Sequence, residues 1–218
     1  TPAGVDADLT GDYSDKALDA EWSENDADAV ISFDNNAVDV TGSGASVSGT
    51  TVTISDKGTY VIKGTLSDGQ IIVDNEDDEN VRLILDGVDI TCSTDSAIKA
   101  LNAKNVYITL ADGTTNTVTD SRAASDDTDS NDSDVTDAAI YAECDLIING
   151  SGTLNVNGNY NDGIKSKDDL QIISGTINVD AYDDGIIGKD SVSVKDGTIT
   201  VTCGDDAVKS SEDEDSTK

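Results

Sequence analysis

The sequence predicts an all-β fold in which one short unit is stacked on copies of itself, as a parallel β-helix (a solenoid) of about six to seven coils. A short phrase recurs: an acidic or polar pair, a small residue and a branched aliphatic. Its last three aliphatics, Ile164, Ile186 and Val208, are spaced 22 residues apart. Apolar and polar residues also alternate in short runs between Gly and Asp, which indicates strands.

The units can be followed along the chain. Strand-like pieces at Ala29–Phe33, Ala37–Val40 and Thr50–Ile54 precede a first clear coil at Gly58–Glu79. Five later units align, and each begins with a polar residue that is followed by an inward aliphatic. These units start at Asn80, Asn105, Asp145, Asp169 and Ser191.

Each complete unit contains three short predicted strands. In the third aligned unit, Leu146 and Ile148 form the inward face of the first strand, and Leu154 and Val156 that of the second. A Ser-Gly-Thr turn separates these two strands, and the acidic turn precedes a third strand at Ile164. Successive units would lie about 4.8 Å apart, the ordinary spacing of paired strands.

The domain organisation follows from where this pattern holds. Residues 1–28 are polar and acidic apart from Trp22, and we expect a linker or cap before a repeat domain at 29–218. An acidic, low-complexity insertion at 119–136 predicts a surface loop. The chain starts without methionine and stops before another strand, so we expect a trimmed, secreted piece of a longer protein.

The composition excludes several classes of function. The chain has 218 residues, a formal net charge of −32 and no His. Such acidity argues against nucleic acid and anionic membranes as partners, and no apolar run is long enough to insert into a bilayer. The absence of His excludes a His-dependent triad and imidazole-bound zinc. We expect a monomer or a module of a larger surface protein.

The recurring acidic turns are the main functional prediction. The chain has 38 Asp and only 7 Glu, and the Asp residues concentrate in turns that stacking would bring into one row. Ca²⁺ takes six to eight oxygen ligands, so we predict several calcium ions along this row. The alternative is that these Asp residues only form turns. The candidate ligands are Asp137, Asn161, Asp162, Asp168, Asp183, Asp184, Asp190, Asp205, Asp206 and Glu212.

Two other sets of residues are candidates for sugar contact. Tyrosines near the acidic turns could stack on sugar rings, or could simply stack on one another: Tyr141, Tyr160 and Tyr182. Lysines share the position after the third-strand aliphatic and could contact sugar hydroxyls or carboxylates, or could only compensate local charge: Lys99, Lys165 and Lys209.

Longer segments show a family resemblance. They read VSGTTVTISDKGTYVIKGTLSDGQIIVD at 47–74, VRLILDGVDITCSTDSAI at 81–98, GSGTLNVNGNYNDGIKSKDDL at 150–170 and DDGIIGKDSVSVKDGTITV at 183–201. Over roughly residues 29–212 the chain resembles the bacterial calcium-containing β-helix domains that bind cellulose and polygalacturonate, non-catalytic relatives of the pectate-lyase fold. The resemblance implies a right-handed β-helix, calcium, a polysaccharide ligand and a secreted or bacterial cell-surface location. By position, Asp162, Asp183, Asp184, Asp205 and Asp206 match the family's acidic turns, whereas at Asp137 and Ala138 the doublet degrades.

Three functions are consistent with these patterns. The first is non-catalytic, calcium-dependent binding of a plant cell-wall polysaccharide, either polygalacturonate (pectin) or cellulose. The second is a calcium-dependent pectate lyase with Lys165 or Lys209 as base, although near-equivalent residues in every unit argue against a single active site. The third is a structural surface stalk that calcium rigidifies.

Overall fold

The computed structural model describes residues 13–124 and 136–210, and nearly every regular element in them is a strand. Two short helices, α1 (Asp15–Leu18) and η1 (Glu24–Asp26), precede the strands. A 12-stranded sheet contains β1 (Ala29–Asn35), β2 (Ala37–Gly42), β5 (Gly58–Leu66), β7 (Asn80–Cys92), β9 (Asn105–Leu110), β10 (Thr115–Asp120), β12 (Asp145–Gly150), β13 (Thr153–Gly158), β15 (Asp169–Ile172), β16 (Thr176–Ala181), β18 (Ser191–Val194) and β19 (Thr198–Thr202).

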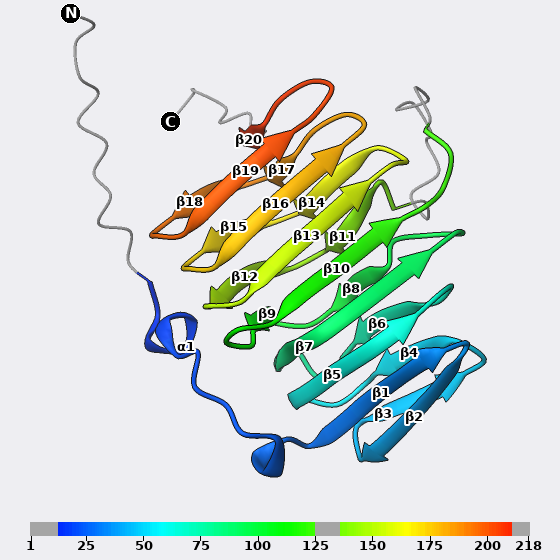
Figure 1. The fold of residues 1–218 in the computed structure, drawn as a ribbon. Coiled ribbons are helices and arrows are strands. Elements are labelled where there is room, and N and C mark those ends of the chain that lie inside the picture. The colour runs from blue at the N-terminus through cyan, green and yellow to red at the C-terminus, as the bar shows by residue number, and fades with distance from the viewer. Residues whose placement is uncertain (1–12, 125–135, 211–218) are drawn as a thin grey trace, which may run out of the picture.

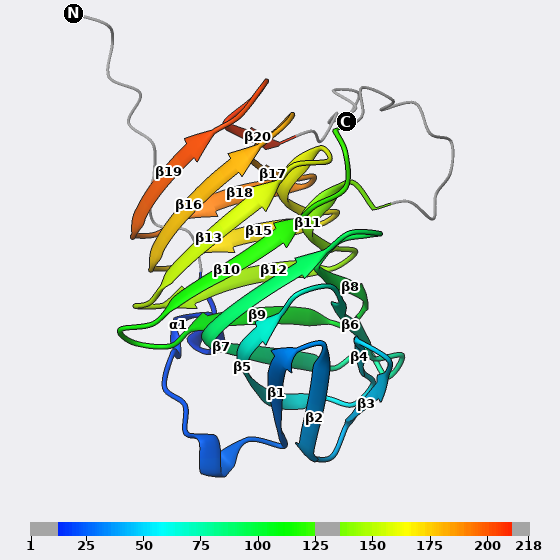
Figure 2. The ribbon, with the colours of Figure 1, turned by 45° about the vertical axis from the view of Figure 1, so that its right-hand side comes forward.

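The second sheet has eight strands: β3 (Ala45–Ser48), β4 (Thr51–Ile54), β6 (Gln70–Asp74), β8 (Ile98–Asn102), β11 (Ala138–Ala142), β14 (Asp162–Ser166), β17 (Ile186–Gly188) and β20 (Val208–Ser210). Its neighbours follow the order β20-β17-β14-β11-β8-β6-β4-β3. In both sheets the strands are parallel except for one antiparallel pair each, β1 with β2 and β3 with β4. Figures 1 and 2 show the strands rising in steps from the blue N-terminal end to the red C-terminal end.

The long strand β7 gives the larger sheet its curvature. Its first half, Asn80–Leu85, pairs with β9, and its second half, from Asp89 to Cys92, pairs with β10. Between the halves, Gly87 adopts a φ of 74°, a conformation that favours glycine. The buried Asn116 side chain accepts hydrogen bonds from the backbone N–H groups of Gly87 and Val88 at 2.9 and 3.0 Å. The sheet therefore continues around this bend from β18 to β19.

The all-β class is confirmed, but the predicted right-handed parallel β-helix solenoid of about six to seven coils is wrong. The strands form a curled, half-barrel-like, mostly parallel sheet and a second sheet, and each sheet contains one antiparallel pair among the first four strands. Alternation and turn residues predicted the strands and their neighbours. They did not show that two segments separated by Gly87 form one continuous strand, or that the early strands fold back on themselves.

Residues predicted to be equivalent do lie side by side in register. Leu146 pairs with Val106 on one side and with Leu170 on the other. In the second sheet Ile164 lies between Ile140 and Ile186. These side chains are buried in one core between the two sheets. Burying an aliphatic side chain contributes about 1.5–3 kcal/mol, so the repeated pattern is the main source of stability.

Residues 13–28, which we call the strap, lie outside both sheets and run along one side of the larger sheet (Figures 1 and 2). The strap covers two small apolar clusters on the outer surface. Ala17 and Tyr13 pack with Tyr107, Ile147 and Ile173. Trp22 and Ala27 of the strap, with Val30 of β1, pack with Val61, Ile84 and Ala111.

The remaining predicted segments are placed only in part. The predicted insertion at 119–136 begins inside β10, which ends at Asp120, and residues 125–135 lie outside the described part of the chain. Among the described residues, no helix is long and apolar enough to span a bilayer.

Candidate functional site

The acidic turns precede β14, β17 and β20 and lie in register. Gly163 donates its backbone N–H to the carbonyl of Asp184 at 3.0 Å, and Gly185 donates to that of Asp206 at 2.9 Å. The side chains repeat the connection, because Asp162 Oδ1 accepts from the Asp184 N–H at 3.2 Å and Asp184 Oδ1 accepts from the Asp206 N–H at 2.9 Å. Each aspartate therefore positions the turn 22 residues further along the chain.

The glycine of each turn is required by close packing. A Cβ on Gly163 would lie 2.3 Å from Val179 Cγ1 and 2.6 Å from the carbonyl oxygen of Gly185. A Cβ on Gly185 would meet Val201 and the Ala207 carbonyl in the same way, at 2.3 and 2.7 Å. The Asp-Gly sequence thus allows successive turns to approach closely, and this approach brings their carboxylates together.

Two groups of three carboxylates result. Asp162, Asp183 and Asp184 form the first, and Asp184, Asp205 and Asp206 form the second, with ligand oxygens of each group all within 4.8 Å of one another. Asp184 belongs to both groups. Asp162 and Asp184 are only 2% and 4% exposed, whereas Asp205 and Asp206 are exposed. The structure therefore brings together five of the ten predicted ligands.

The donor set suits a hard cation such as Ca²⁺. All donors are carboxylate oxygens, the type of ligand that Ca²⁺ prefers. At this spacing two carboxylates repel by about 3 kcal/mol at an effective dielectric near 20, and a cation would relieve this. Asn161 is buried beside the first group, and its carbonyl accepts from the Asp183 N–H at 2.9 Å. In the preceding row, Asp137 Oδ1 is buried without a hydrogen-bond partner among the described residues.

Lysines lie against the carboxylates. Lys165 Nζ is 2.5 Å from Asp137 Oδ2 and 3.1 Å from Asp162 Oδ2, and Lys209 Nζ is 2.8 Å from Asp184 Oδ2. Lys99 pairs with Asp95 at 2.9 Å. The register runs Lys99, Tyr141, Lys165, Ile187, Lys209, so a lysine occupies every second row. These ammonium groups neutralise part of the acidic row, as the charge-compensation alternative supposed.

Burial and mutual repulsion shift the pKa values of the site. Burial raises the pKa of Asp162 to about 6, despite the opposing effect of Lys165. Burial, together with Asp184 and Asp205, also raises the pKa of Asp183. Burial lowers the pKa of Lys165, but the carboxylates of Asp137 and Asp162 outweigh this and hold it above its ordinary value. The first group therefore carries an unfavourable buried charge that a cation would stabilise.

Two predicted ligands lie elsewhere. Asp168 and Asp190 are neighbours, with the Asp190 N–H donating to the Asp168 carbonyl at 3.2 Å, but they follow the ends of β14 and β17. Asp162 is at the start of β14, and four residue steps along a strand span about 13 Å. These residues therefore do not share an ion with the acidic turns. Glu212 lies outside the described residues.

The predicted tyrosine platforms differ in exposure. Tyr141 is buried and donates a hydrogen bond to Glu143, and Lys167 Nζ lies 5.9 Å from its ring centroid. Tyr160 is half-buried under the Arg122 guanidinium, whose Cζ is 4.0 Å from the ring centroid. Tyr182 is 42% exposed. Only Tyr182 of the three presents much ring surface to solvent.

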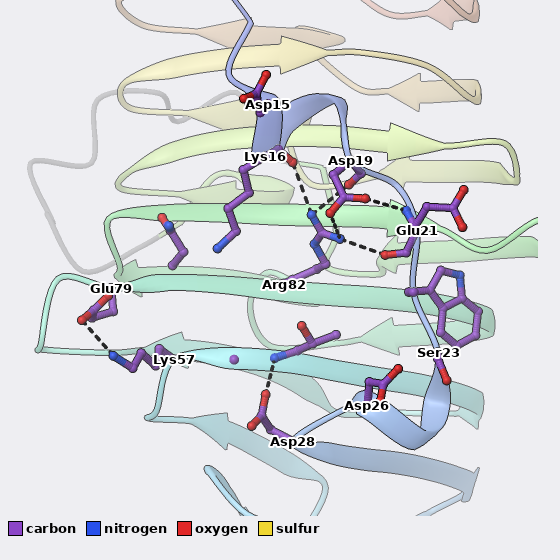
Figure 3. Close-up of a pocket in the computed structure, with 14 residues that line it drawn as sticks. Asp15, Lys16, Asp19, Glu21, Ser23, Asp26, Asp28, Lys57, Glu79 and Arg82 are labelled. Carbon is purple, nitrogen blue, oxygen red and sulfur yellow. Dashed lines mark hydrogen bonds and ion pairs between the residues drawn. The ribbon is translucent and has the colours of Figure 1, made fainter.

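The strap forms a cavity that the sequence did not reveal. Arg82, 7% exposed on β7, donates hydrogen bonds to the strap carbonyls of Lys16, Asp19 and Glu21 at 3.3, 2.8 and 3.3 Å (Figure 3). A cavity of about 1050 Å³ lies between the strap and the larger sheet. Some of its charged groups are paired: Lys57 contacts Glu79 at 3.1 Å, and Asp28 accepts from the Thr59 N–H at 2.8 Å. In the sequence, the feature that could have indicated this attachment is the arginine within the apolar run VRLIL at 81–85.

Comparison with known proteins identifies the family of this chain. The family described as carbohydrate-binding domain-containing protein matches residues 48–218, most of the chain, and the chain belongs to this family. The resemblance to carbohydrate-binding domains inferred from the sequence is confirmed at this level.

One protein and one solved structure are similar to most of this chain. A carbohydrate-binding domain-containing protein of Acetivibrio thermocellus is 40% identical over 161 residues, which cover 73% of this chain and 55% of that protein. The chain therefore spans little more than half of that relative's length. The solved structure of a polysaccharide lyase-like protein from C. thermocellum, a gadolinium derivative, is 39% identical and superposes with a TM-score of 0.79 over 88% of this chain and 77% of that one.

Proposed function

We propose that this protein is a non-catalytic module that binds plant cell-wall polysaccharide with the help of calcium held by the acidic turns. The observation that carries this proposal is the pair of carboxylate groups that share Asp184, within a chain of the carbohydrate-binding family. The related lyase-like structure is a gadolinium derivative, and Gd³⁺, like Ca²⁺, is a hard cation that takes oxygen ligands.

The two groups offer different surroundings to an ion. Asp162 and Asp184 are buried, and their Oδ1 atoms already accept backbone hydrogen bonds. Their Oδ2 atoms face Lys165 and Lys209, which would have to move away for an ion to enter. The second group also has the exposed Asp205 and Asp206, where solvent or a glycan can complete a coordination shell.

This arrangement explains how an acidic protein could hold an acidic polymer. With a net charge of −32, the chain would repel a polyuronate at long range. Calcium at the exposed group would supply charge neutralisation and a shared ligand position for the carboxylate of a galacturonate unit. Polygalacturonate is therefore the favoured ligand of the acidic turns. Because such polymers lie outside cells, we also propose a secreted or cell-surface location.

The test is retention in polygalacturonate affinity gels with calcium or with EGTA, alongside calorimetric titration with CaCl₂. Wild-type protein should be retarded in calcium and released in EGTA. Asp184→Asn removes the carboxylate common to both groups and should lose both calcium binding and retention. Asp89→Asn, an exposed acid on β7, is the matched control and should behave as wild type. Retention that is unchanged in EGTA and in D184N would refute the proposal.

Lyase activity is the second candidate, favoured by the lyase-like description of the related structure and by Lys165 and Lys209 beside the carboxylates. Both ammonium groups are ion-paired in this structure, which favours their protonated form and makes them poor bases. The measurement is the growth of unsaturated product from polygalacturonate, followed by ultraviolet absorbance in calcium. Turnover that Lys165→Ala or Lys209→Ala abolishes would establish the lyase instead of the binding module.

A further inference from the structure

A second cavity, of about 670 Å³, shares Glu21 and Trp22 in its lining with the one in Figure 3. It is formed by the strap and by the turns that lead into β13, β16 and β19. The acidic turns lie at the opposite ends of these strands, so the length of a six-residue strand, about 17–20 Å, separates the two sites. We propose that this groove, which we call the Trp22 groove, binds an uncharged hexose polymer without calcium. The proposal shares only the general class of ligand with the function proposed above.

Trp22 supplies an aromatic surface. It is the one Trp of the chain, it is half-buried against Val61, Ile84 and Ala111, and it lines both cavities. A half-buried indole that packs on the sheet and also lines a cavity suits stacking against the C–H face of a pyranose ring.

The turns supply a ladder of hydroxyl groups. Ser151 Oγ donates to Asp112 Oδ1 at 2.8 Å, and Ser174 Oγ donates to the Gly150 carbonyl at 2.8 Å. Each hydroxyl therefore keeps its acceptor lone pairs for sugar hydroxyls. Thr176 and Thr198 are register partners on neighbouring strands, which lie about 4.8 Å apart. This spacing is close to the length of one hexose unit in an extended glucan, so successive units would meet equivalent groups.

The charges of the groove exclude an acidic sugar. Its lining among the described residues contains Glu21, Asp112 and Asp196 but no lysine or arginine. A uronate would be repelled there, whereas neutral sugar hydroxyls can donate hydrogen bonds to carboxylates. The acidic turns differ because lysines lie between their carboxylates and because they can hold an ion.

The experiment uses the single Trp as a reporter. Cellohexaose is titrated into the protein in EGTA while Trp fluorescence is followed, and retention on insoluble cellulose is measured in parallel. We expect a saturable fluorescence change and calcium-independent retention. Trp22→Ala should reduce retention about tenfold or more, as removing a central aromatic contact commonly does.

A second variant keeps the proposal testable if Trp22→Ala loosens the strap. Thr198→Glu places a bulky charge at an exposed groove position without touching Trp22, and should weaken cellohexaose binding to a similar extent. Thr200→Glu, exposed on the same strand outside the groove, and Asp184→Asn should both bind as wild type. Absence of any response to cellohexaose at millimolar concentration, or equal binding by T198E and T200E, would overturn the proposal. Loss of polygalacturonate retention in D184N leaves this site unaffected, so the two proposals fail separately.

Discussion

The buried charge of Asp162 makes a specific prediction about pH and stability. Its pKa is about 6 in the folded protein, against an ordinary value of 3.8. A folded pKa above the unfolded one gives stability that is complete below the unfolded pKa and is lost as pH rises through the folded pKa. A difference of about two units corresponds to about 3 kcal/mol. Between about pH 4 and pH 6.5 the wild type should therefore lose up to this amount relative to Asp162→Asn, which carries no charge there.

The assay is urea unfolding of wild type and D162N in EGTA at several pH values across this window. The variant keeps an oxygen that can accept from the Asp184 N–H, so the local backbone contact is retained. Titrating groups away from Asp162 contribute equally to both proteins, so the difference between the two curves reports Asp162 and the groups in contact with it, Asp137 and Lys165. The expected difference rises with pH in favour of D162N. A pH-independent difference would refute the reasoning, because burial would then not disfavour this carboxylate.

Three further predictions concern the ion, the turns and the strap. At a free calcium concentration of 100 times Kd, the wild type should gain about 2.7 kcal/mol in free energy of unfolding, and D184N, assayed by thermal melting beside D89N, should lose this gain. Gly163→Ala should cost about 1–3 kcal/mol in urea unfolding because its Cβ would meet Val179 at 2.3 Å; Thr200→Ala, exposed on β19, should cost less than about 1 kcal/mol. Arg82→Gln should cost about 2–4 kcal/mol and expose the strap to proteases, whereas Lys63→Gln, which breaks only the exposed pair with Glu24, should cost less than about 1 kcal/mol. Equal protease resistance of R82Q and K63Q would contradict the anchoring role of Arg82.

The sequence predicted local features better than the overall architecture. Period-two alternation identified the strands, and the 22-residue spacing placed Ile164, Ile186 and Val208 in one register column. The same spacing brought Asp162 and Asp184 together, since neighbours in register share a turn geometry. The curvature of the larger sheet was not predicted because local features accompany it, the bend at Gly87 held by Asn116 and the irregularity at Gly64 of β5, and these leave no periodic signal.

The residues of the candidate sites were likewise predicted only in part. Asp168 was a candidate ligand beside Asp162, but it follows the strand that Asp162 begins, and the length of that strand separates the two carboxylates. The strap was predicted only as a linker or cap, because its attachment depends on contacts with Arg82 and Asn149, which are distant in sequence. Trp22 was noticed as an isolated apolar residue, yet its partners Val61 and Ile84 read as ordinary strand residues.

The strap also affects how the molecule unfolds. In a stack where each row touches only the next, rows can fray one at a time from either end, and stability is nearly a sum of neighbouring terms. Residues 13–28 contact Arg82, Tyr107, Asn149 and Ile173, which belong to different rows, so this segment links the rows to one another. Opening one of these rows disturbs a segment that also contacts the others. Amide hydrogen exchange should therefore give one common free energy of opening for the linked rows, in place of values that rise from the end of the sheet inward.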